Sequence, residues 1–201
     1  MTLSNRTMIL EYADKLLSGG HLERTESEKL AGLAGADLVD LFASANRVRD
    51  HFRGSNIDLC SIINARSGAC GEDCRFCAQS SHYHTDAQIY DLVDLSKISG
   101  AAIAAKENGA KRFCIVTSGR GIDSDDDLRL IGRGLDRVRS IGLLPCATLG
   151  SLSKSQLRYL KDAGLNRYHH NIETSREFFP EICSTHTFDE RVELLNYAQD
   201  I

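Results

Sequence analysis

From residue 58 onward the sequence alternates short apolar runs with longer segments of helical periodicity, and this alternation constrains the fold more than any other feature. The apolar runs, which predict strands, are 58–64, 112–117, 143–149 and 165–172. The segments that predict helices are 96–108, 125–141, 153–164 and 187–201. Strands that alternate with helices favour parallel βα units. The sequence therefore predicts an α/β fold with about four such units.

Four βα units could make a small open sheet or half of an eight-unit barrel. With 201 residues, length alone slightly favours the open sheet, because a full barrel needs roughly 200 or more residues without any extension. In both arrangements the carboxyl ends of the strands carry the active sites. The long polar segment 65–93 follows the first predicted strand, and loops of this length are usually functional.

The segment before these units has a different pattern. Helical periodicity covers 7–19, 25–33 and 36–52. Thr25 with Glu28 resembles a capping box at the start of the second of these helices. We therefore expect a helical N-terminal extension over 1–54 and a partial βα core over 55–201.

The charge and hydropathy of the chain exclude several classes of partner. Its 24 basic and 28 acidic residues give a net charge of −4, so there is no electrostatic footprint for nucleic acid or for an anionic membrane surface. The sequence contains no run of about 18 consecutive apolar residues, the length that would span a bilayer. The first 20 residues have neither the basic start nor the apolar run of a signal peptide, so a cytoplasmic location is expected.

Seven cysteines are many for a chain expected in the cytoplasm, where metal binding or catalysis is a better interpretation than a disulfide framework. Cys70, Cys74 and Cys77 form a CxxxCxxC triplet in the long loop. Thiolates are soft ligands for iron–sulfur clusters and for zinc. Three ligands leave one iron of a cluster open to a small molecule, which suits catalysis. A structural zinc site with His82 or His84 as fourth ligand is the alternative.

The CxxxCxxC triplet after the first strand resembles the signature of radical S-adenosylmethionine (SAM) enzymes, and its surroundings resemble the biotin synthases within that group. The agreement covers about residues 35–201 and is carried by 63–68, 77–81, 112–114, 146–150 and 168–175. The resemblance implies the first half of a TIM-type (β/α)8 barrel, with a 4Fe–4S cluster on the three loop cysteines and SAM at its open iron. It also implies a sulfurtransferase that inserts sulfur into dethiobiotin to form biotin.

The same resemblance implies roles for five further residues. Cys114 and Cys146 match two cysteine ligands of a second, 2Fe–2S cluster on the second and third strands. Asn171 matches an asparagine near the substrate and the SAM ribose, and Glu173 matches an acidic residue that binds the ribose hydroxyls. Phe76 resembles an aromatic position near the adenine. From the residues alone, the strand cysteines could be small buried hydrophobes, Glu173 a solvated charge and Phe76 an apolar anchor of the loop.

Other candidate residues match no ligand position of the family. Cys60 and Cys183 are interpreted as thiols that bind no metal. His169 departs from one common form of the motif, which has asparagine there. His169 and His170 are adjacent in a predicted strand, so we expect their side chains on opposite faces rather than in one metal site.

The resemblance further implies a flavodoxin-type electron donor and a homodimer in the full-length form. The family's third 2Fe–2S cysteine and its arginine ligand lie beyond the segment that matches 187–201, and this sequence has neither. We therefore expect a truncated or fragmentary chain that keeps the SAM cluster motif, has an incomplete 2Fe–2S ligand set and does not turn over. The alternatives are another radical SAM enzyme, such as the hydrogenase-maturation or methylornithine-forming relatives, a non-catalytic zinc module on the loop, and a fragment without a stable fold.

Overall fold

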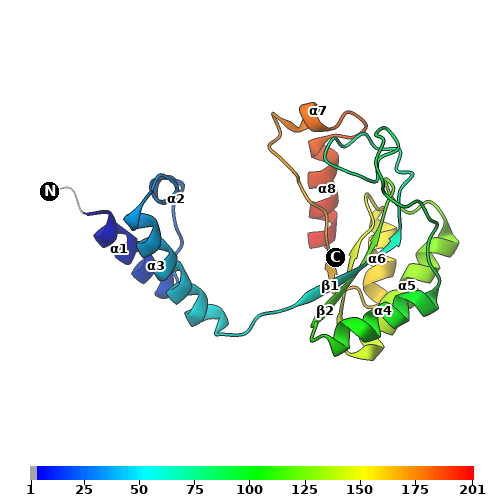
Figure 1. Cartoon of the computed structure of the whole chain (residues 1–201), viewed down its shortest axis with the longest axis horizontal. Coiled ribbons are helices and arrows are strands. Elements are labelled where there is room, and N and C mark those ends of the chain that lie inside the picture. Colours follow the sequence, from blue (N-terminus) through cyan, green and yellow to red (C-terminus); the bar gives the residue numbers. More distant parts are fainter. Residues whose placement is uncertain (1–3) are drawn as a thin grey trace. The chain divides into compact units, whose positions relative to one another are not determined.

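The computed structural model describes residues 4–201, which form two compact units, one ending at Ile57 and the other covering Asp58–Ile201 (Figure 1). The first unit contains three helices, α1 (Asn5–Leu17), α2 (Arg24–Ala31) and α3 (Ala36–Arg53). Helix α1 packs along α3 and buries Ile9 and Ala13. Within the described residues, no helix of either unit is long and apolar enough to cross a membrane.

The start of α2 differs from the capping box predicted at Thr25 and Glu28. The helix begins at Arg24, and the backbone N–H of Glu23 donates to the carboxylate of Glu26 at 2.7 Å. The box therefore lies two residues earlier than predicted, because Glu26 is the residue that can reach back to the amide left free at this helix start.

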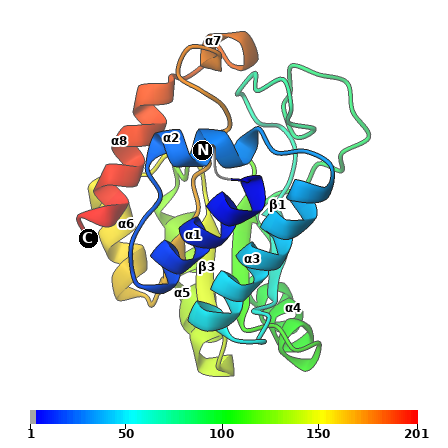
Figure 2. The ribbon, with the colours of Figure 1, turned by 90° about the vertical axis from the view of Figure 1, so that its left-hand side faces the viewer.

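Four parallel strands form the sheet of the second unit, in the order β1 (Cys60–Arg66), β2 (Arg112–Thr117), β3 (Leu144–Thr148) and β4 (Arg167–Tyr168). The connections contain α4 (Leu95–Glu107), α5 (Asp125–Ile141) and α6 (Lys154–Asp162), and α7 (Phe179–Ile182) and α8 (Phe188–Gln199) follow β4 (Figure 2). A doubly wound open sheet reverses its strand order at a switch point, whereas a barrel keeps its strands in sequential order. The predicted α/β fold with four βα units is thus confirmed, and its topology is that of the first half of a barrel.

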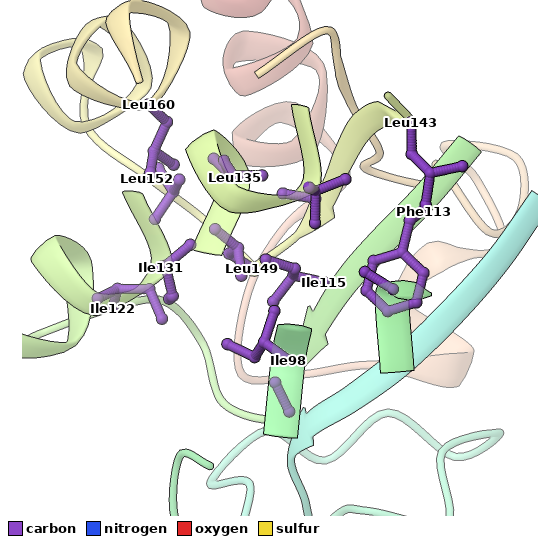
Figure 3. Close-up of a cluster of buried hydrophobic side chains, with 14 of the residues drawn as sticks. Ile98, Phe113, Ile115, Ile122, Ile131, Leu135, Leu143, Leu149, Leu152 and Leu160 are labelled. Carbon is purple, nitrogen blue, oxygen red and sulfur yellow. The ribbon is translucent and has the colours of Figure 1, made fainter. Parts of the chain in front are cut away.

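One face of this sheet packs against α4, α5 and α6, and the side chains of the other face are not part of that core in the described residues. Because side chains alternate along a strand, Phe113 and Ile115 of β2 join the helix layer, and Cys114 lies on the opposite face. The core between the sheet and α4, α5 and α6 includes Ile98, Phe113, Ile115, Ile131, Leu135, Leu149 and Leu160 (Figure 3). Each such buried side chain stabilises the fold by about 1.5–3 kcal/mol. On the open face Ile62 of β1 is 63% exposed, as expected for the inner face of a barrel when four strands stand alone.

The strand boundaries differ from the predicted ones mainly in β1 and β4, the two edge strands of the described sheet. Strand β4 has two residues rather than the predicted 165–172, and after Tyr168 the N–H of His169 donates to the Ala147 carbonyl at 2.8 Å before the chain leaves the sheet. In the described sheet β4 pairs on one side only, so no second ladder extends it. Strand β1 is shifted two residues toward the C-terminus from the predicted 58–64. The sequence does not predict α7, whose four residues are too few to show a helical period.

Candidate metal and cofactor site

A cavity of about 220 Å³ opens at the carboxyl ends of the strands. Its lining includes Thr117 and Thr148, the last residues of β2 and β3, together with the loop after β1 and the segment after β4. In both views of the whole chain, α7 and the long loop after β1 lie at the same end of the sheet (Figure 1, Figure 2). Six residues to which the sequence analysis assigns a role line this cavity: Cys70, Cys74, Phe76, Cys77, Asn171 and Glu173.

The cysteine loop leaves β1 through a left-handed turn. Gly68 and Ala69 have φ angles of +71° and +50°. A Cβ on Gly68 would lie 2.7 Å from Cγ1 of Ile89, so both the backbone angle and the close approach require glycine there. The N–H of Cys70 then donates to the carbonyl of Gln79 at 3.1 Å. The loop therefore folds back on itself and holds Cys70 buried at its start.

Asp73 fastens the cysteine loop to the segment before α8. Its carboxylate accepts hydrogen bonds from the N–H of Ser184 at 2.9 Å and the N–H of Thr185 at 3.2 Å, and the Ser184 hydroxyl also donates to it. The N–H of Asp73 donates in turn to Oγ1 of Thr185 at 3.2 Å. The hydrogen bonds from Ser184, first the hydroxyl and then the amide, hold the pKa of Asp73 well below its usual value. We refer to Asp73 with Ser184 and Thr185 as the clasp.

Replacing Asp73 by alanine should release the clasp without touching a cysteine. The amides of Ser184 and Thr185 lose a charged acceptor, so we expect their exchange with solvent deuterium to accelerate about tenfold or more. Hydrogen exchange read by mass spectrometry checks this, with the exposed loop residue Asp86, changed to alanine, as the matched control. Because the pKa of Asp73 is lowered, wild-type protection should persist above the ordinary aspartate pKa and disappear only as the pH falls well below it. Equal exchange rates in Asp73→Ala and wild type would show that the clasp does not order this segment.

Cys74 lies where the loop meets the segment before α8. Its Sγ is 3.8 Å from Sγ of Cys183, which in turn contacts His186. Burial raises the pKa of the Cys74 thiol to about 12, and Cys183 adds to this effect. Cys70 is also buried, Cys77 is half-buried, and all three loop thiols are free.

The three loop thiols do not meet at the close spacing of a single-ion site. Within residues 4–201, the group of three metal-type ligand atoms that all lie within 4.8 Å of one another is Cys74, Cys183 and His186, not the loop triplet. A cluster binds its thiolates through separate irons, so it accepts a wider spacing than one ion does. His82, an alternative zinc ligand, is exposed with Nε2 3.0 Å from the Gly71 carbonyl, and His84 is exposed as well. This geometry does not favour a zinc site built on the loop alone.

Arg191 of α8 organises a second wall of the cavity. Its guanidinium donates to the carbonyl of Asn171 at 2.6 Å and to Nε2 of His186 at 3.0 Å, and lies 3.8 Å from the carboxylate of Glu173. Glu173 has a φ angle of +71°, and such strained backbone tends to cluster at functional sites. Arg191 and His186 cannot be recognised from the sequence, because no local pattern marks side chains whose partners lie in distant segments.

Two residues that line the cavity have buried polar atoms without a hydrogen-bond partner in the described chain, Oγ1 of Thr117 and Nε2 of His170. Burial, followed by the charges of Arg191 and His186, lowers the pKa of His170 to about 4, so its ring is neutral near pH 7. Buried polar groups normally have a partner, so these two atoms fit a polar ligand in the cavity. His169, next to His170, is not part of the lining.

Cys114 and Cys146 are direct neighbours on the open face of the sheet. They pair in register across β2 and β3, and both are buried. Burial raises the pKa of both thiols, that of Cys114 to about 11. Neither residue lines the cavity, so the sheet cysteines form a group separate from the loop cysteines. Cys60 of β1 shares their face of the sheet, where it is exposed.

Comparison with known proteins places these features in context. A family model described as the radical SAM superfamily matches residues 65–201. The chain is 47% identical over 195 residues to a biotin synthase of Heliobacterium modesticaldum, an alignment that covers 96% of this chain and 60% of the relative. It is 49% identical over 191 residues to a biotin synthase of Pelobacter propionicus, covering 94% of this chain and 58% of the relative. The chain therefore spans about 60% of the length of these curated relatives.

Solved structures agree on the fold. A maturase of the FeFe-hydrogenase matches with a TM-score of 0.79 and 15% identity, over 98% of this chain and 44% of that chain. A methylornithine synthase matches with a TM-score of 0.76 and 22% identity, over 94% of this chain and 55% of that chain. At these identities the likeness supports the arrangement of strands and helices and nothing finer.

Proposed function

The chain belongs to the radical SAM superfamily, and from that premise we propose that it provides the SAM-binding part of a biotin synthase, which inserts sulfur into dethiobiotin to form biotin. One observation carries the proposal. The three loop cysteines and the two residues expected to contact SAM, Asn171 and Glu173, line a single cavity at the carboxyl ends of the strands. The identity of 47–49% to curated biotin synthases supports the choice of reaction within the superfamily.

In this proposal Cys70, Cys74 and Cys77 bind a 4Fe–4S cluster and leave one iron open to SAM. Such a cluster supplies the electron that breaks the sulfonium of bound SAM, which leads to removal of hydrogen from an unactivated carbon. The donor set fits, because three free thiols border a cavity that also contains polar atoms without partners.

The second wall would hold the nucleoside part of SAM. Glu173 accepts hydrogen bonds from the ribose hydroxyls, and Asn171 contacts both ribose and substrate. Arg191 acts as a positioning residue, since it holds the Asn171 carbonyl and lies beside the Glu173 carboxylate. Phe76 is 55% exposed at the edge of the cavity, so its ring is free to pack against the adenine.

Cys114 and Cys146 would supply two ligands of a 2Fe–2S cluster on the open face of the sheet. Their pairing in register supports this role, because neighbouring strands bring two thiols to one place. By resemblance to the family, the other ligands of this cluster belong to the segment that follows the region matched here. A flavodoxin-type electron donor and a homodimer complete the proposal by resemblance to the family.

A chimera tests the proposed reaction. The segment of the Heliobacterium modesticaldum biotin synthase that follows the region of alignment is joined after Ile201, and the protein is loaded anaerobically with iron and sulfide. With SAM, dithionite and dethiobiotin, we expect biotin to form, and the same chimera carrying Cys77→Ala should form none. A loaded chimera that cleaves SAM to methionine and 5′-deoxyadenosine but leaves dethiobiotin unchanged would contradict the biotin synthase assignment and leave the SAM chemistry standing.

A further inference from the structure

Cys74, Cys183 and His186 meet at the junction between the cysteine loop and the segment before α8. Cys74 and Cys183 are 109 positions apart in the sequence, yet their Sγ atoms are 3.8 Å apart. Sγ of Cys183 is 3.2 Å from Nδ1 of His186 and 3.7 Å from Nε2 of the same ring. We propose that these three side chains form a mononuclear site for zinc or ferrous iron in the cluster-free protein.

The distances are those of one tetrahedral ion. Zinc binds thiolate at about 2.3 Å and imidazole at about 2.0–2.1 Å, so two thiolates on one ion are about 3.8 Å apart and a thiolate and an imidazole nitrogen about 3.5 Å. The Cys74–Cys183 distance of 3.8 Å equals the first value, and the two Cys183–His186 distances of 3.2 and 3.7 Å bracket the second. Two sulfurs and one nitrogen are a donor set that soft or borderline transition ions prefer.

The surroundings supply what a buried ion needs. Cys74 and Cys183 are 7% and 4% exposed, and the side chain of His186 is 9% exposed, so the ligand atoms are held in place by packing. The Glu72 carboxylate contacts Nδ1 of His186 and accepts a hydrogen bond from the Thr185 hydroxyl at 2.6 Å. Glu72 is therefore available as a fourth ligand.

Nδ1 of His186 is the ring nitrogen that would bind, because it is the nearer to Cys183 and Arg191 occupies Nε2. In the ion-free ring Nε2 accepts from Arg191 at 3.0 Å, so Nδ1 carries the ring proton and faces Glu72. Binding at Nδ1 therefore moves the ring proton to Nε2 and breaks the hydrogen bond from Arg191. Two thiolates and the Glu72 carboxylate also balance the charges of a divalent ion and the Arg191 guanidinium. The local sequence, Cys183 and His186 three positions apart, brings two ligands together, and the fold adds Cys74.

This site shares Cys74 with the loop triplet. If Cys74 also holds the 4Fe–4S cluster, a consequence that rests on the proposed function, then an ion at the new site and the cluster compete for one thiolate. Ferrous iron there would be exchanged as the cluster forms, whereas zinc, which prefers this donor set strongly, would resist displacement. The site itself depends only on the geometry of the three side chains.

Cobalt(II) is the probe for the site, because tetrahedral cobalt–thiolate complexes absorb in the visible and near ultraviolet. The cluster-free 201-residue chain is titrated with cobalt under reducing, anaerobic conditions, and the ion is then displaced with zinc. We expect one tetrahedral cobalt per chain, and Cys183→Ala and His186→Ala should each weaken binding by more than about 100-fold, since even changes beside a metal ligand cost about 10–100-fold. Cys70→Ala and Cys77→Ala should leave the affinity unchanged, and Cys60→Ala is the control for an exposed thiol.

The outcomes separate the two possible sites. Binding that is lost in Cys70→Ala or Cys77→Ala and kept in Cys183→Ala would place the ion on the loop triplet and overturn the proposal, as would the absence of a tetrahedral spectrum in wild type. Circular dichroism confirms that each variant is folded, and Cys183→Ser and His186→Gln replace any alanine variant that is not. In a second arm, zinc added before cluster reconstitution should lower the iron and sulfide content of wild type and not of Cys183→Ala. Equal inhibition of both would contradict the competition, whether or not the protein makes biotin.

Discussion

The Cys77→Ala chain should leave anaerobic reconstitution with almost no bound sulfide and without the visible absorption of an iron–sulfur cluster. Cys77 is the loop cysteine best suited to this test, because unlike Cys74 it lies outside the group with Cys183 and His186, and unlike Cys70 it is only half-buried. Removing one of three thiolates leaves two, and two ligands do not retain a 4Fe–4S cluster that already has an open iron. The expected effect is loss of the whole cluster rather than a change in its properties.

Cys60→Ala is the matched control for this experiment. Cys60 is exposed on the open face of β1 and does not line the cavity, so its removal should leave the iron and sulfide content at the wild-type level. Iron and sulfide analysis with the absorption spectrum measures both variants in one preparation. A Cys77→Ala chain that retains a full complement of iron and sulfide would refute the assignment of the loop triplet as the cluster ligands.

The Gly150→Ala chain should be less stable by about 2–6 kcal/mol, the combined cost of left-handed backbone and of overpacking. Gly150 lies just after β3 with a φ angle of +74°, and a Cβ there would lie 2.2 Å from the carbonyl oxygen of Arg120. That carbonyl already accepts a hydrogen bond from the N–H of Ser151 at 2.6 Å, so it cannot move without breaking that contact. Because Gly150 and Arg120 both line the cavity, we also expect the substitution to disturb the site.

Gly109→Ala separates the two contributions. Gly109 follows α4 with a φ angle of +83°, close to that of Gly150, but the nearest atom to its added Cβ is Cδ1 of Leu59 at 3.9 Å. This control carries the backbone strain without the clash, so it should lose about 1–3 kcal/mol. Urea unfolding followed by circular dichroism gives both values. Equal losses of unfolding free energy in the two variants would mean that the Arg120 carbonyl moves away from the added Cβ at no energetic cost, which would contradict the predicted clash.

The fold was largely predictable because its signals are local. The alternation of apolar runs and helical periods identifies all four strands, and Ser153 caps α6 as its position before a helical pattern suggests, with its hydroxyl accepting from Gln156 at 3.2 Å. The predicted boundaries are wrong where contacts with another part of the chain determine the end of an element. Strand β4 stops early because it pairs on one side only, and the capping box of α2 moves to Glu23 and Glu26 because the Glu26 carboxylate reaches the free backbone N–H at the helix start.

The residues of the candidate site likewise fall into those that a local pattern reveals and those that only the fold brings together. Cys70, Cys74 and Cys77 are visible in the sequence because their spacing is short and specific. Cys183 looks like an ordinary thiol in the sequence, since its partner Cys74 is 109 positions away and only the folded chain brings the two sulfurs to 3.8 Å. Arg191 cannot be recognised from the sequence either, because its contacts with Asn171 and Glu173 form only when α8 packs beside the cavity. Long-range contacts of this kind require the fold before they can be seen.

The clasp also sets an order of events while the protein is being made. Asp73 is synthesised 112 positions before Thr185, its partner in the clasp. At about 5–20 residues per second, the ribosome needs about 6–22 s to supply that partner after the cysteine loop has been made. During this interval the loop thiols are present without the segment that holds them, so a metal ion that reaches them early meets a loosely ordered chain. If the loop binds the proposed cluster, iron and sulfide would meet an ordered loop only after the chain has passed residue 185.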